Sequence, residues 1–527
     1  MTVGVLGRVD PQGSLLETRV VRRHLVTKGS FYERLADHGH EIFGDDDFAE
    51  LYSPRMGRPS IPPSVMIRAM LCATHDRTPS DAETSRRTRV DADWKAAMGV
   101  DDDFEGIAAR TFSLMRARMI AHDADNELFE ATLAKAVRAG IFKGRLTAII
   151  DSSPVNGAGA VADSYELIRG FVRQAVRAAG GRLSRSGRRV AEPFCGAKPD
   201  IDWQDPAARR AHLGRLVGAA RVVMAELADV SDPAIAEPVG WLAQVIEADT
   251  EPDPDGGGDG GVRLREGVAP DRVISVSDPQ MRHGRKSSSR RFDGHKMDLV
   301  TDEASELVLG LDVRAANAAD GEGAMPLLDQ VQSVAGVALD TLVGDMAYSE
   351  GDIRVGAEAR GVTLVAKVPP LSNGGRYPQT DFYVDLAAGE VTCPAGEVTT
   401  AVTPSHDHKG RPGLLFRFDP TECATCPLRS DCTTSTGGRS VFVGIHHERI
   451  FAARAAQSDP AIVALLRDRA KVERKIDHLQ DLGMRKARYR GRRKTKHQGL
   501  MAATVANINR LDVLGALNQP AHLERAA

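Results

Sequence analysis

The stretch GRLTAIIDSSPVNGAGA, residues 144–160, decides the fold class. Its apolar run 146–150 has the length of a buried strand, and Asp151 ends it before a loop rich in Gly, Ser and Pro. A second short run, DTLVGD at 340–345, has the same form and ends at Asp345. Such strands alternate with helical patterns, which predicts a mixed α/β sheet with both acids at carboxyl ends of strands.

The rest of the chain extends this pattern. Helices are predicted over most of 26–140 and 160–250, and strands over RVISVSD (272–278) and on both sides of a turn at Asp302–Ser305. A helix (325–336), the strand 340–345, a helix (351–360) and a strand (363–368) follow, whereas 370–450 is expected to be irregular. The final long helix begins at Ser458-Asp459-Pro460, an N-cap acid followed by a first-turn proline, and ends at Gly483.

The 527 residues are too many for one ordinary domain, and an apolar content of 42% can supply several cores. The predicted division is an arm (1–25), a helical DNA-binding domain (26–140), a core (141–160 and 262–369), a helical insert and linker (161–261), a Cys-rich insert (370–450) and C-terminal core helices (451–515). The start of the chain lacks a secretory h-region and no run is long enough for a membrane span, so a cytoplasmic, nucleoid-associated protein without membrane contact is expected.

Two acids at neighbouring strand ends repel each other unless a cation or a partner compensates them. Mg²⁺ is held by such carboxylates, and two metal ions can support an in-line phosphoryl displacement. Glu473, which flanks the apolar stripe of the last long helix, is the candidate third carboxylate, with Arg469 one turn earlier as a phosphate ligand. Residue chemistry alone leaves alternatives open: Asp151 could be a turn acid, and Glu473 could simply pair with Arg469.

Several stretches resemble the DDE transposases of bacterial insertion sequences, in the branch with a helical N-terminal domain and a cysteine-bearing insert. The matching stretches are FEGIAARTFSLMRARM (104–119), AIIDSSPV (148–155), DPQMRHGRKSSSRRFDGHKMDLVTD (278–302), VGDMAYSEGD (343–352), CPAG (393–396), CATCPLRSDC (423–432) and the segment 469–511. The resemblance implies an RNase H-like core and Mg²⁺-dependent cleavage and strand transfer at insertion-sequence ends, with Mn²⁺ as a substitute ion. It also implies double-stranded DNA partners, namely terminal inverted repeats and target, and a homodimer or larger assembly.

The family's catalytic, metal-binding acids fall on Asp151, Asp345 and Glu473 of this sequence. A related branch has a Tyr-Arg-Glu-Lys signature, which is matched here only in part: Arg469 and Glu473 fit, but Leu466 stands at the Tyr position and Gln480 at the Lys position. The alternative functions are an RNase H-like nuclease without strand transfer and a non-catalytic, zinc-stabilised DNA-binding protein.

Four of the six cysteines cluster in the predicted Cys-rich insert. Cys423 and Cys426 have metal-ligand spacing, and Cys432 and Cys393 complete a tetrahedral set for structural Zn²⁺. Reduced cysteines without a metal are the alternative.

The net charge of −3 hides local basic runs that predict DNA contact. The predicted DNA-binding residues are Arg285, Lys286, Arg290, Arg291, Lys296, Arg469, Arg485, Lys486, Arg488, Arg490, Arg492 and Arg493. His295 could also approach the scissile phosphate, and N-terminal arginines including Arg68 could read the element ends. A solvated basic face is the alternative for the run that begins at Arg485.

Overall fold

A computed structural model describes residues 4–10, 12–55, 57–254, 261–286 and 289–518. The chain divides into two compact units. The first comprises the residues up to Gly144, Asp151–Ala338 and the residues from Val472 on, and the second comprises Arg145–Ile150 and Leu339–Lys471. Among the described residues, no helix has the length and apolar character needed to cross a membrane.

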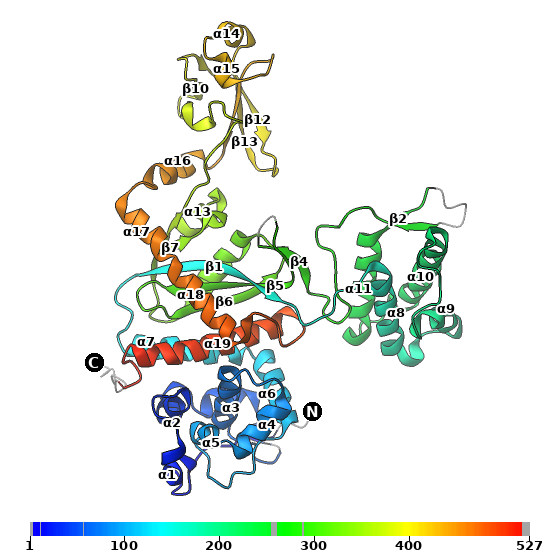
Figure 1. Cartoon of the computed structure of the whole chain (residues 1–527), viewed down its shortest axis with the longest axis vertical. Helices are drawn as coiled ribbons and strands as arrows, with labels where there is room; N and C mark the ends of the chain where they lie inside the picture. The colour runs from blue at the N-terminus through cyan, green and yellow to red at the C-terminus, as the bar shows by residue number, and fades with distance from the viewer. Residues whose placement is uncertain (1–3, 11, 56, 255–260, 287–288, 519–527) are drawn as a thin grey trace. The chain divides into compact units, whose positions relative to one another are not determined.

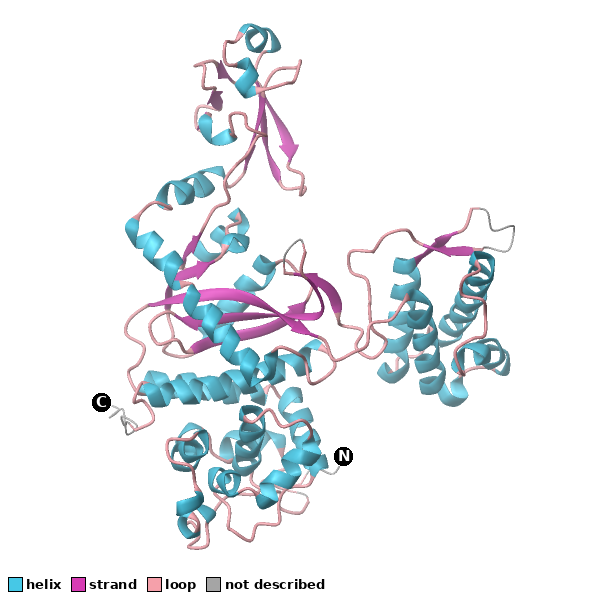
Figure 2. Cartoon of the chain, viewed as in Figure 1, coloured by secondary structure: helices cyan, strands magenta, loops and turns pink. Residues whose placement is uncertain are grey.

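The predicted N-terminal helices are confirmed (Figure 2). They are α2 (Phe31–Ile42), α3 (Pro63–His75), α4 (Asp81–Val90), α5 (Ala92–Met98), α6 (Ala109–Ala121) and α7 (Ala124–Arg138). A further short helix, α1 (Thr18–Val21), lies in the segment predicted as an arm. Side chains of Ser30, Ser80 and Asp91 cap α2, α4 and α5. The C-terminal helix α19 (Arg492–Val513) belongs to the same core, because its Met501, Val505 and Ile508 cluster with buried residues of α2 and α3.

The predicted helical insert is also confirmed. Its helices are α8 (Ser164–Ala179), α9 (Arg185–Cys195), α10 (Pro206–Leu227) and α11 (Pro233–Asp249), which pack together around their own apolar core (Figure 1). The acidic loop predicted at 251–261 lies partly outside the described residues, at 255–260. Its flanks pair as a short antiparallel hairpin, β2 (Thr250–Pro252) with β3 (Val262–Leu264).

The mixed sheet has the order β4-β5-β1-β7-β8, with β6 paired to β5. Its strands are β1 (Leu146–Asn156), β4 (Arg282–Arg285), β5 (Arg291–Asp302), β6 (Val308–Ala315), β7 (Leu339–Gly344) and β8 (Thr363–Ala366). β1, β7 and β8 run parallel, whereas β4 and β6 each pair antiparallel with β5. Gly294 of β5 comes so close to β1 that an added Cβ would lie 2.1 Å from the Val155 carbonyl oxygen.

One predicted strand is wrong. Residues 272–278, all of them described, form an extended segment outside any strand, although Val273 and Ile274 are buried. The Ala162 amide donates to the Ile274 carbonyl, so the segment is tied to the start of the helical insert. Its apolar pattern therefore reflects burial against the insert and not membership of the sheet.

Helices α12 (Ala324–Ser333) and α13 (Gly351–Glu358) agree with prediction, but the Cys-rich region is more regular than expected. It contains two three-stranded antiparallel sheets, β9 (Tyr383–Asp385), β10 (Glu390–Thr392) and β11 (Val398–Thr399), then β12 (Val402–His406), β13 (Pro412–Arg417) and β14 (Ser440–Gly444). Short helices α14 (Pro420–Thr425) and α15 (Arg429–Cys432) carry Cys423 and Cys432, and Cys426 is the C-cap residue of α14. Helix α16 (His447–Ala456) follows.

The last long helix is nearly continuous. Asp459 caps α17 (Pro460–Asp468), as predicted, by accepting a hydrogen bond of 2.7 Å from the Ala461 amide. Arg469 separates α17 from α18 (Ala470–Leu479), and a π-helical turn (Gln480–Met484) follows. Gly483 ends the helical geometry with a φ of 107°.

Candidate active site

Asp151 lies within β1, which continues to Asn156, so the prediction that Asp151 ends the strand is wrong. The polar residues 151–153 continue the extended backbone of the apolar run before them. Its side chain is half-buried, and its Oδ1 accepts a 2.8 Å hydrogen bond from the amide of Ser152. The Ser152 hydroxyl donates over 2.8 Å to Asp320, which also accepts a 2.7 Å bond from the ammonium of Lys296. The carboxylate predicted from the sequence is therefore held in a polar network, of which Asp320 was not predicted.

Glu473 lies on the exposed side of α18, in the same compact unit as Asp151. Seven residues make nearly two helical turns, so Glu473 and Gln480 project from the same side of the helix. Gln480 donates a 2.9 Å hydrogen bond to the hydroxyl of Ser153. Since side chains alternate along a strand, Ser153 shares its face of β1 with Asp151. The glutamine that stands at the expected lysine position thus fastens the Glu473 helix to the Asp151 face.

Asp345 follows β7 in the second unit. Its Oδ1 caps the short 3₁₀ turn Met346–Tyr348 by accepting a 2.8 Å bond from the Ala347 amide. β7 pairs in parallel with the first half of β1, and Val343 is the register partner of Ile149. Asp345 and Asp151 each come two residues after this matched pair.

Two family models match the chain. The model described as "Transposase DDE domain" matches residues 392–512, which include Glu473, and the model described as "Transposase domain (DUF772)" matches residues 20–118. Both matches support a DDE transposase of an insertion sequence. Neither a curated protein nor a solved structure matches it. The first two acids lie outside both matched ranges, so their assignment depends on the resemblance of the stretches 148–155 and 343–352.

DDE transposases generally use divalent metal ions. No three His, Cys, Asp or Glu side chains in the described part of the chain are grouped closely enough to hold an ion. The donor chemistry nonetheless fits a hard cation, because the strand-end groups are carboxylate and hydroxyl oxygens. The partial burial of Asp151 also favours an ion that offsets the desolvation of its charge.

The four predicted zinc ligands line one cavity of about 400 Å³. Its lining includes Cys393, Cys423, Cys426 and Cys432. Burial raises the pKa of the Cys432 thiol, and the neighbouring thiols raise it further while Arg439 opposes them. No disulfide joins these cysteines in the described chain. The core beside the cavity is small, with Phe416 among its few fully buried side chains.

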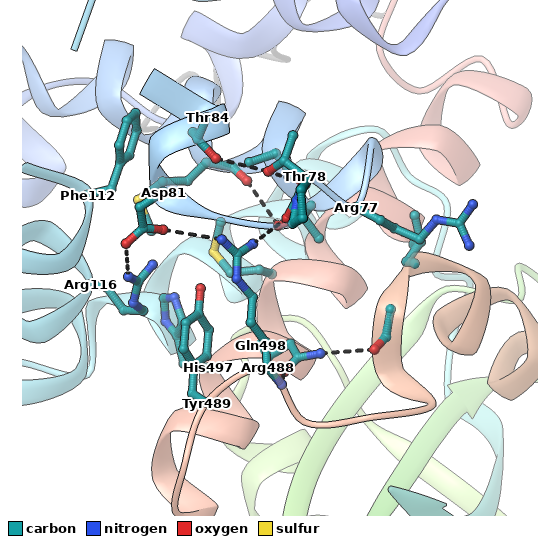
Figure 3. Close-up of a pocket in the computed structure, with 17 residues that line it drawn as sticks. Arg77, Thr78, Asp81, Thr84, Phe112, Arg116, Arg488, Tyr489, His497 and Gln498 are labelled. Carbon is teal, nitrogen blue, oxygen red and sulfur yellow. Dashed lines mark hydrogen bonds and ion pairs between the residues drawn. The ribbon is translucent and has the colours of Figure 1, made fainter. Parts of the chain in front are cut away.

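The basic run after α18 is divided between inward and outward side chains. Arg488 donates to the Thr78 carbonyl and pairs with Asp81 at 3.3 Å, and Arg116 pairs with the same acid at 2.6 Å (Figure 3). The Arg116 guanidinium also lies 4.4 Å from the centre of the Tyr489 ring. Arg488 is therefore occupied by protein contacts, which its predicted DNA role did not anticipate.

Arg493 is likewise engaged. It forms a two-pronged pair with the fully buried Asp125, which also accepts a 3.0 Å bond from His497. The outward members of the run are exposed, namely Arg485, Lys486, Arg490 and Arg492. These four keep side chains that DNA can reach.

The other predicted basic residues also separate by burial. Arg285, Lys286, Arg290 and Arg291 are exposed at the β4–β5 hairpin. The expectation for His295 is wrong, because it has no exposed surface and its Nε2 lies 3.3 Å from Asp278. Lys296 is 8% exposed and Arg68 is 9% exposed, which contradicts direct DNA contact by either side chain. Arg469, half-buried between α17 and α18, stays a prediction.

Proposed function

We propose that this transposase cleaves the ends of its insertion sequence and joins them to target DNA, with Asp151, Asp345 and Glu473 as the catalytic carboxylates. The parallel register of β1 and β7 carries the proposal. It matches Ile149 with Val343, and each of the two acids comes two residues after its member of this pair. The Gln480–Ser153 hydrogen bond supports adding the Glu473 helix to the face of β1 that bears Asp151.

The three carboxylates would hold Mg²⁺, for which Mn²⁺ can substitute. When bound, the ions lower the energy of charge that develops on the phosphoryl oxygens during displacement. In the first reaction, water forms a bond to the scissile phosphorus while the bond to a 3′-oxygen breaks, freeing a 3′-hydroxyl at the element end. That hydroxyl then attacks a target phosphate, forming one phosphodiester bond as another breaks.

DNA contact falls to the exposed cations. Arg485, Lys486, Arg490 and Arg492 follow the Glu473 helix, and the β4–β5 hairpin adds a second exposed basic group. Both neutralise backbone phosphates of the terminal inverted repeats and target, and they supply position more than sequence information. Joining two ends requires two active sites, so a homodimer or larger assembly forms on DNA.

Structural Zn²⁺ is part of the same proposal. Four thiols that line one cavity offer the ligand set of a tetrahedral zinc site. A bound ion would add stability to the Cys-rich region, whose apolar core is small. The ion would stabilise the Cys-rich region and take no part in phosphoryl transfer.

The test is cleavage of a labelled duplex that carries the element's own end, with Mg²⁺. Wild type should nick at the element boundary, and Glu473→Gln should bind the duplex without cutting it. Asp477→Asn, an exposed acid one turn further along α18, is the matched control and should cut like wild type. Equal cutting by wild type and Glu473→Gln would contradict the assignment of Glu473.

A joining assay on paired ends separates the remaining functions. Nicking without joining would identify a nuclease that lacks strand transfer. Duplex binding with no cutting by wild type would identify a non-catalytic DNA-binding protein.

A further inference from the structure

Asp320 connects the strand that bears Asp151 with a buried lysine. Its Oδ1 accepts hydrogen bonds from the hydroxyl of Ser152 at 2.8 Å and from the ammonium of Lys296 at 2.7 Å. The Lys296 ammonium also donates to the Ala318 carbonyl over 2.6 Å. All four residues belong to the first compact unit.

The loop that carries Asp320 is held from its other side. Arg314 donates to the Ala319 carbonyl at 2.8 Å and to the Asp320 carbonyl at 3.1 Å. The same guanidinium pairs with the buried Asp298. Asp320 therefore sits on a backbone fixed by charge-assisted hydrogen bonds, which restricts the position of its carboxylate.

We propose that Asp320 is a positioning residue for Asp151. It acts through Ser152. The Ser152 hydroxyl donates a hydrogen bond to Asp320, and the Ser152 amide donates one to the Asp151 carboxylate. Holding Ser152 at its side chain fixes the direction of its amide, and that amide orients the oxygen of Asp151. The Lys296 ammonium neutralises the Asp320 carboxylate. Asp320 therefore does not compete with Asp151 for the divalent ion.

This inference rests on the proposed metal role of Asp151. Groups that orient a metal ligand commonly change metal affinity about 10- to 100-fold when they are removed. Asp320 and Ser152 act in one chain of hydrogen bonds, so loss of either should have the same effect as loss of both.

The experiment measures Mn²⁺ binding to the full-length protein by electron paramagnetic resonance, without DNA, and separately the Mg²⁺ concentration that gives half-maximal nicking. Asp320→Ala, Ser152→Ala and the double variant should each weaken Mn²⁺ binding by about 10-fold and raise the Mg²⁺ requirement equally. Asp320→Asn, which keeps an oxygen that can accept the Ser152 hydroxyl, should retain most of the affinity. Asp312→Ala is the matched control, since Asp312 also pairs with a lysine in this unit, Lys496 at 3.2 Å.

The inference would be overturned if the Asp320 and Ser152 variants changed Mn²⁺ affinity no more than Asp312→Ala does. It would also be overturned if the effects of the two single variants added up in the double variant, or if the wild type bound no Mn²⁺. Equal melting temperatures of Asp320→Asn and wild type guard against a folding defect. If the predicted Mn²⁺ shifts occur while wild type fails to nick DNA, the proposed function fails and the positioning role of Asp320 stands.

Discussion

Replacing Asp125 by Asn should loosen the attachment of α19 to the N-terminal helices. Asp125 is fully buried in the first turn of α7. It accepts two hydrogen bonds from Arg493, at 2.5 and 2.7 Å, and one from His497 at 3.0 Å. The Asn side chain has nearly the same shape but lacks the negative charge that binds both partners. The decrease in the free energy of unfolding therefore measures the contribution of that charge.

The size of the effect follows from the pKa of this carboxyl. Burial alone would raise its pKa, but hydrogen bonds and charges from Arg493 and His497 lower it from 3.8 to about 2. At about 1.36 kcal/mol per pKa unit, this difference corresponds to about 2 kcal/mol of unfolding free energy. The folded pKa lies below the unfolded one, so the stabilisation is complete above about pH 4 and is lost as the pH falls toward about 2. The full effect is therefore expected at pH 7.

The assay is urea unfolding followed by the fluorescence of Trp94, which is buried in the same core cluster as Met501 of α19. A background with Trp203→Phe and Trp241→Phe makes Trp94 the sole reporter, so the transition of this region is isolated in a multidomain chain.

Asp123→Asn is the matched control. Asp123 contacts the same Arg493 at 3.0 Å, but its side chain is 65% exposed, so its loss should cost less than about 1 kcal/mol. Equal unfolding free energies for the Asp125 and Asp123 variants at pH 7 would refute the reasoning.

Two further predictions concern the basic run and the cysteines. Arg490→Ala should reduce the steepness of the plot of log affinity for duplex DNA against log salt concentration by about 1. Arg488→Ala should lower the melting temperature and leave that slope unchanged. The opposite pattern would contradict the division into outward and inward arginines. Cys426→Ser should abolish zinc measured by metal analysis and lower the melting temperature of the Cys-rich region, while Cys195→Ser in the helical insert should retain the metal; a wild-type protein without zinc would contradict the proposed site.

Most strands of the mixed sheet could be predicted because their sequences are short, apolar and bounded by turn residues. The runs at 146–150, 340–345 and 363–368 are of this kind, and each forms a strand. The run at 272–278 has the same composition but is buried against the helical insert, and burial by a helix leaves the same apolar signature as burial in a sheet. The strands β9–β14 escaped prediction because they are short and mostly exposed on one side.

The candidate acids could be proposed from the sequence, but their connections could not. An Asp that follows a short apolar run has a local signature, whereas the Gln480–Ser153 bond joins residues 327 positions apart. The resemblance drew attention to Gln480 only as a departure from an expected Lys. Asp320 has no local signature either, since its partners Ser152 and Lys296 lie on two different strands. Such relations depend on the register of the sheet, which a single sequence does not specify.

The division of the basic run also explains how exposed cations can be held beside the end of β1. Asn156, the last residue of β1, accepts a 2.7 Å hydrogen bond from the Ala487 amide and donates its own amide to the Arg485 carbonyl at 3.1 Å. Beyond this bridge, Arg488 is held by Asp81 of the N-terminal helices. The run is thus held on both sides, and its outward side chains start within a few residues of the backbone bonds to β1, the strand that carries Asp151. Inward arginines are occupied by protein contacts, and these contacts hold the backbone from which the outward cations project.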